Sequence, residues 1–220
     1  MTDASPYVQY VVDCETTGVN PDKHDVIEVC FWRLSDDECK TWCLKPLDVE
    51  AIDDRALKIN KHKRDDLIHK TAKGRETYLD PAVVLPEIEM WIMQDGVGSE
   101  NRVFIGQNPK FDYDFLVKLW QKMNTEETFP FGFWLGEGED RINLGFIIDT
   151  IQLARVIDLC TDKRRRRYGL GALVKDFGIT KAQAHRADGD VKMTKDLYLK
   201  MIEGIREAAV EHFSDCYTTW

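Results

Sequence analysis

The chain has 220 residues, of which 43% are hydrophobic and 31% charged, and its formal net charge is −9. These values are typical of a single globular domain over residues 1–220. No apolar run reaches the roughly 18–20 residues of a membrane span, and the acidic total argues against a protein that coats nucleic acid by overall charge, though not against a nucleic-acid enzyme.

Three strand-like runs, rich in β-branched and aromatic residues, open the chain at 7–14, 26–34 and 39–44. Turn-forming residues at 20–22 and 35–38 separate them, so we predict a meander of three antiparallel strands. Residues before the first run are polar and show no secretory signal, and six cysteines form no Cys-x-x-Cys pair. We therefore expect a cytoplasmic protein with reduced thiols and no zinc site.

The remainder of the chain alternates between helices and short strands. Residues 48–80 are polar and helical in character, and Asp80-Pro81 is a capped helix start, with Pro86 as an alternative. The elements that follow are predicted as a helix to about 94, a strand at 102–106, a helix at 109–123, a strand at 146–149, and helices to about 159, at 169–177 and from 188 to about 208. This order predicts an α/β fold with a mixed five-stranded sheet flanked by helices.

Residues 124–145 are rich in Gly, Phe and Glu and have no clean periodicity. We interpret them as an insertion or lid loop within the single domain. Phe131, Phe133 and Trp134 are candidates for stacking on nucleic-acid bases.

The first chemically suggestive block contains Asp13 and Glu15, two residues apart on a predicted strand. Their carboxylates leave the same face, where they repel each other unless a cation compensates. Magnesium prefers such oxygen ligands. Solvated acids at a strand end are the alternative. Thr16, Thr17 and Gly18 follow, with hydroxyls and an open backbone that a sugar or phosphate could approach.

Two further blocks contain acids or a histidine. Asp112 lies in the first turn of a helix behind a buried strand, where an acid is also favourable for the helix alone, and Asp114 could fill that place. His185 precedes Asp190 by five residues at the entry to the final helix. Such a histidine is more often simply exposed, yet its pKa suits proton transfer near neutrality.

Together the blocks resemble those of the DEDDh (DnaQ-like) 3′–5′ exonucleases of the ribonuclease H-like superfamily. The first matches Asp-x-Glu-Thr-Thr-Gly, and the third matches His-x-Ala-x-x-Asp at His185 to Asp190. The second resembles Asn-x-x-Phe-Asp from Asn108, with Gln107 where histidine is frequent. The resemblance covers roughly residues 8–205.

The resemblance implies a ribonuclease H-like fold and two-metal hydrolysis that releases nucleoside 5′-monophosphates from single-stranded 3′ ends. Asp13, Glu15, Asp112 and Asp190 would hold two Mg²⁺ or Mn²⁺ ions, with His185 as general base. Glu28 and Asp149, acids in family-like segments, are interpreted as structural or as supports of the ligands.

Basic residues are the least specific signals. Lys163 to Arg167 are usually a solvated loop, but beside a nuclease site we interpret them, and Arg164 and Arg165 in particular, as candidate phosphate contacts. The run Lys61 to Arg64 is a weaker candidate for the same role. Asn108 is a further candidate substrate contact.

Several questions stay open at this stage. DNA is favoured slightly over RNA as the substrate, and the role could be proofreading, DNA repair, RNA turnover or phage DNA degradation, with a polymerase or replication protein as a possible partner. A catalytically silent nucleic-acid-binding module, a 3′–5′ exoribonuclease and an endonuclease of related fold are the alternatives. The oligomeric state cannot be predicted from these residues.

Overall fold

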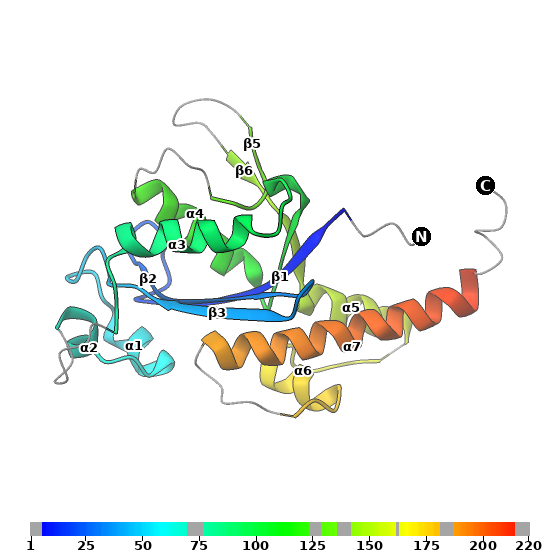
Figure 1. Cartoon of the computed structure of the whole chain (residues 1–220). Helices are drawn as coiled ribbons and strands as arrows, with labels where there is room; N and C mark the ends of the chain where they lie inside the picture. Colours follow the sequence, from blue (N-terminus) through cyan, green and yellow to red (C-terminus); the bar gives the residue numbers. More distant parts are fainter. Residues whose placement is uncertain are drawn as a thin grey trace.

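The computed structural model describes residues 6–69, 77–123, 129–135, 142–161, 163–180 and 187–213. Figure 1 shows a central sheet with helices on both faces. The elements are β1 (Val8–Thr16), β2 (Val26–Arg33), β3 (Glu38–Cys43), α1 (Asp54–Asn60), α2 (Arg64–Ile68), α3 (Pro81–Met93), η1 (Ser99–Asn101), β4 (Arg102–Gly106), α4 (Pro109–Lys122), β5 (Phe133–Leu135), β6 (Ile142–Leu144), β7 (Phe146–Asp149), α5 (Thr150–Cys160), α6 (Leu170–Asp176) and α7 (Ala187–Phe213).

The main sheet has the strand order β3-β2-β1-β4-β7. β1 pairs antiparallel with β2, and β2 pairs antiparallel with β3. β4 pairs parallel with β1 and β7 pairs parallel with β4. The predicted meander, the mixed sheet and its five strands are therefore confirmed.

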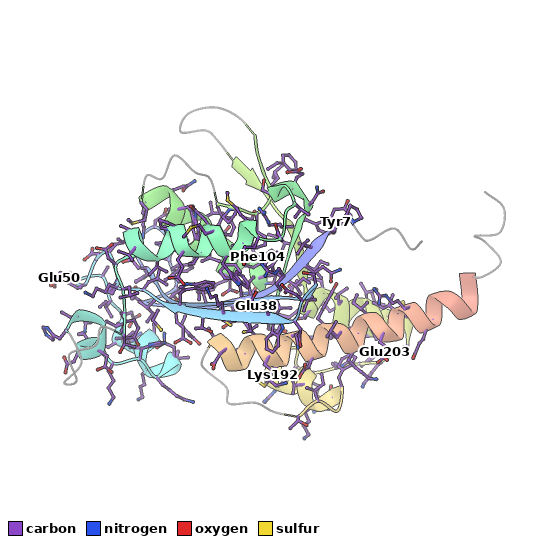
Figure 2. All side chains as sticks on the ribbon, in the orientation of Figure 1. Tyr7, Glu38, Glu50, Phe104, Lys192 and Glu203 are labelled. Atoms are coloured by element: carbon purple, nitrogen blue, oxygen red, sulfur yellow. The ribbon has the colours of Figure 1, made fainter. Side chains whose placement is uncertain are left out.

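Side-chain alternation along β1 separates two cores. Tyr10, Val12 and Cys14 pack with α3 and α4 on one face, whereas Val11 packs with α7 on the other. Figure 2 shows Phe104 within the layer beside α3 and the exposed Lys192 and Glu203 on α7. The central strand β1 is thus covered on both faces. Its second half extends beyond its pairing with β4, which ends at Val11.

Capping residues account for the start of α3. Asp80 accepts a hydrogen bond from the backbone N–H of Ala82, and Pro81 occupies the first helical position. Pro86 lies inside the helix, so the alternative start at this proline is wrong. None of the helices in the described ranges is long and apolar enough to cross a membrane.

The segment 124–145 is more ordered than predicted in the part that the structure describes. Strands β5 and β6 form an antiparallel pair there. Phe131 is fully buried and stacks on Phe31 in the main core, with ring centroids 6.0 Å apart, so the prediction that it stacks on bases is wrong. Phe133 is 48% exposed, and Trp134 has no described side chain.

Candidate functional site

Three carboxylates meet on the α7 side of the sheet. Asp13 and Glu15 come from the second half of β1, and Asp190 comes from the first turn of α7. Each offers one oxygen, and these oxygens lie within 4.8 Å of one another. All three residues remain partly exposed. Residues at opposite ends of the chain therefore form one acidic cluster that solvent can reach.

Asp112 approaches the same point from the other face. β1 pairs with β4 only as far as Val11, and beyond it the backbone N–H of Cys14 donates to Asp112 Oδ1 at 3.0 Å. The Cys14 thiol donates to the same oxygen at 3.1 Å. Asp112 is buried, whereas Asp114 pairs with Lys110 at the surface. The alternative that Asp114 takes this place is therefore not supported.

Burial raises the pKa values of two of these carboxyl groups. Burial, followed by the charges of Asp112, Glu15, Asp190 and Glu28, holds the pKa of Asp13 well above its usual range. Burial raises the pKa of Asp112 to about 7, against the lowering effect of its bonds from Cys14. Groups of this kind ionise together only when positive charge is close by.

This arrangement fits a divalent cation. Closely spaced carboxylate oxygens are the ligands that Mg²⁺ and Mn²⁺ prefer, and the negative charges of Asp112, Glu15 and Asp190 contribute to the raised pKa of Asp13. The acidic cluster itself consists of Asp13, Glu15 and Asp190. Asp112 lies beside it and accepts a hydrogen bond from the backbone N–H of Cys14.

The Thr16-Thr17-Gly18 turn holds the backbone behind Glu15. The Thr17 hydroxyl is buried and accepts from the N–H of Asp25, while the Thr16 hydroxyl donates to Gly18 O. A Cβ on Gly18 would lie 2.3 Å from the His24 ring. Both hydroxyls are therefore engaged within the fold, and the Thr17 side chain is buried rather than presented to a substrate.

The start of α4 is braced from neighbouring strands. Asn108 is exposed in a left-handed conformation (φ 59°), and its N–H donates to Asp149 Oδ1. The same Asp149 oxygen caps α5 at Ile151, so its predicted structural role is confirmed. The Gln107 amide donates to Tyr168 O and accepts from the Thr150 hydroxyl.

The basic segment contains two different kinds of arginine. Arg164 is exposed and lines a surface pocket with Arg155, Lys163 and Tyr168. The Arg165 side chain is 4% exposed and forms ion pairs with Asp158 and Asp176. Arg165 thus links α5 to α6, and its donors are not presented to a nucleic-acid strand.

A buried polar chain lies behind the cluster, and of its members only Glu28 is interpreted from the sequence as a structural or supporting residue. Glu28, His62 and Tyr78 form it, and each has less than a tenth of its surface exposed. Within the Lys61 to Arg64 run, Arg64 pairs with Asp54 and donates to backbone carbonyls, whereas Lys61 and Lys63 are exposed. Only the histidine at the centre of this run hinted at another role.

His185, the predicted general base, lies outside the described residues, which resume at Ala187.

A family model described as an exonuclease, RNase T, matches residues 10–198. The chain is 26% identical over 216 residues to the DNA polymerase III PolC-type of Staphylococcus saprophyticus, covering 96% of the chain and 12% of that protein. The corresponding protein of Thermotoga petrophila is 26% identical over 211 residues, covering 93% of the chain and again 12% of the relative. The chain thus spans about an eighth of these curated relatives.

Solved structures share the fold. The zinc-bound complex of Escherichia coli exonuclease I with single-stranded DNA superposes with a TM-score of 0.67 and 16% identity, covering 94% of this chain and 42% of that one. Cell-death related nuclease 4 gives a TM-score of 0.64 at 13% identity, with 90% and 64% covered.

Proposed function

Because this chain belongs to the RNase T exonuclease family, we propose that it is a metal-dependent 3′–5′ exonuclease. Its substrates would be single-stranded nucleic-acid ends and its products nucleoside 5′-monophosphates. The observation that carries this proposal is the meeting of Asp13, Glu15 and Asp190 within 4.8 Å, with Asp112 tied to the backbone between the first two.

Four carboxylates would hold two Mg²⁺ or Mn²⁺ ions: Asp13, Glu15, Asp112 and Asp190. Bound ions supply a deprotonated attacking water and stabilise charge on the departing oxygen. The protein's part is to keep the ligands in place. Cys14 does this for Asp112 with two hydrogen bonds, and because burial raises the pKa of its thiol, the thiol stays protonated and remains a donor.

His185 would act as the general base that accepts a proton from the attacking water. Its position five residues before Asp190, within the stretch that the family model matches, supports this role. An imidazole titrates close to neutral pH, so it can accept and release a proton during each turnover.

Substrate contacts are proposed for exposed groups around the cluster. Asn108 lies four residues before Asp112, at the exposed start of α4, and would contact the terminal nucleotide. Arg164 would contact a backbone phosphate, and its segment is tied to this region because Gln107 donates to Tyr168 O. Thr16, Thr17 and Gly18 would act mainly by shaping the turn beside Glu15. Phe133 is the exposed candidate for base stacking.

DNA is the preferred substrate in this proposal. The curated relatives are named DNA polymerases, and the superposed exonuclease I holds single-stranded DNA. Those names also support a replication protein as partner and proofreading or repair as the role.

The proposal is tested with 5′-labelled single-stranded DNA and RNA, each with Mg²⁺ or Mn²⁺. We expect stepwise shortening of DNA from the 3′ end, complete loss in Asp13→Ala, and full activity in the control Asp114→Ala, which changes a surface acid of α4. Circular dichroism confirms that each variant is folded. Binding without cleavage by the wild type would instead indicate a silent module, shortening of RNA alone an exoribonuclease, and internal products an endonuclease.

A further inference from the structure

Glu28 is a fully buried acid directly behind the acidic cluster. It lies in β2 opposite Glu15, so both side chains are on the same face of the sheet. Its charge contributes to the raised pKa of Asp13, after the larger effects of burial and of Asp112, Glu15 and Asp190. A buried carboxylate is unfavourable unless its oxygens are hydrogen-bonded or paired with charge.

One oxygen of this carboxylate fixes the start of α7. Glu28 Oε1 accepts the backbone N–H of Ala187 at 3.0 Å. Ala187 is the first residue of the helix, and Asp190 follows three residues later in the same turn. The unpaired N–H groups of a helix N-terminus favour an anionic acceptor. The position of Asp190 relative to β1 therefore depends on the orientation of Glu28.

The second oxygen faces a buried histidine. Glu28 Oε2 lies 3.3 Å from His62 Nε2, within ion-pair distance but without hydrogen-bond geometry, and the other ring nitrogen, Nδ1, lies 2.6 Å from the Tyr78 hydroxyl. His62 directly follows the C-cap of α1, and the nearby Asn60 amide donates to Thr16 O at the end of β1. The α1–α2 segment is thus joined to both strands at the level of the cluster.

From these contacts we infer that His62, supported by Tyr78, is a positioning residue that orients Glu28 and thereby holds the first turn of α7, with Asp190, against the metal site. This inference rests on the proposed function. It assigns the α1–α2 segment a part in metal affinity, although none of its residues belongs to the acidic cluster. Removing a residue behind a metal ligand typically lowers metal affinity by about 10–100-fold.

The experiment measures Mn²⁺ binding by calorimetry on the whole chain. His62→Ala is expected to weaken Mn²⁺ affinity by about tenfold. His62→Gln should restore most of it, because a glutamine amide can donate from near the position of Nε2. Tyr78→Phe should weaken affinity in the same direction but less. The Mn²⁺ concentration for half-maximal cleavage should rise in His62→Ala, with kcat recovered at saturation.

Leu57→Ala is the matched control, because Leu57 packs in the same apolar cluster as Tyr78. It should lower the melting temperature and leave Mn²⁺ affinity unchanged. If His62→Ala and Tyr78→Phe both bind Mn²⁺ like the wild type while Asp13→Ala does not bind it, the positioning inference is wrong and the proposed function stands. If the wild type and Asp13→Ala bind equally, the proposed function itself fails.

Discussion

Adjacent residues of one type have different environments in this molecule. Arg164 is exposed beside a pocket, whereas Arg165 is buried and paired with Asp158 and Asp176. A run of cations in a sequence therefore contains both candidate phosphate ligands and structural ion pairs.

This difference predicts that substituting Arg164 affects substrate binding, whereas substituting Arg165 affects stability. Arg164→Ala should raise KM for a labelled oligonucleotide, reduce the salt dependence of binding by about 0.7 in log–log slope for one phosphate contact, and leave stability within about 0.5 kcal/mol. Arg165→Ala should cost roughly 3–5 kcal/mol of stability, because it leaves Asp158 buried with its partner removed. Urea denaturation and steady-state kinetics separate the two effects, and an unchanged KM in Arg164→Ala would refute its contact with phosphate.

Residue identities in the acidic cluster could be predicted because strand alternation and the three ordered blocks constrain them. Asp13 and Glu15 share a face because residues two apart on a strand point to the same side of the sheet. His62 and Phe131 could not be predicted, because their burial depends on elements distant in the chain. A histidine within a basic run and a phenylalanine in an aperiodic segment both resemble surface residues until the tertiary packing is known.

At the scale of the elements, the turn from β4 into α4 leaves little room for a side chain. Gly106 ends β4, and a Cβ at this position would lie 2.8 Å from Pro109 Cβ and 3.2 Å from the carbonyl oxygen of Val12. This close approach sets where α4 begins, and hence where Asp112 meets Cys14.

Gly106→Ala should therefore destabilise the protein by about 1–3 kcal/mol and reduce cleavage even where the variant is folded. The matched control is Gly171→Ala in α6, where a Cβ would meet nothing within 4 Å. That change should be neutral or stabilise by up to about 1 kcal/mol. Thermal denaturation with parallel activity assays checks both, and equal behaviour of the two variants would contradict the close-approach argument.

Elements with strong local signals agreed with prediction. The Asp80-Pro81 start, the meander and the strands at 102–106 and 146–149 all appear with small shifts at their ends. The β5–β6 pair was missed, since 124–145 shows no alternation by which short strands are identified.

For the whole molecule, the buried Asp112 carboxyl makes the free energy of unfolding depend on pH. Without metal, burial holds the pKa of Asp112 at about 7, against roughly 3.9 in an unfolded chain. Between these values the folded state binds a proton that the unfolded state has released. The stabilising contribution is thus complete below about pH 4 and lost as pH rises through about 7.

The free energy of unfolding of metal-free protein should accordingly fall between pH 5 and pH 8, and Mg²⁺ should raise the melting temperature more at pH 8, where the ligands ionise readily. Asp112→Asn should be more stable than the wild type at pH 8 without metal and should gain less from Mg²⁺. Differential scanning calorimetry at the two pH values decides this. If the metal-free stability of the wild-type protein rises over this interval, Asp112 is not protonated as inferred.

The positions of Asp13 and Asp190 also have a consequence for biosynthesis. A ribosome adding about 5–20 residues per second needs roughly ten to thirty seconds between these two carboxylates, and α7 must then pack against the sheet to bring them together. Contacts between such distant segments form late in folding. The acidic cluster is therefore expected to be complete only after almost the whole domain has been synthesised.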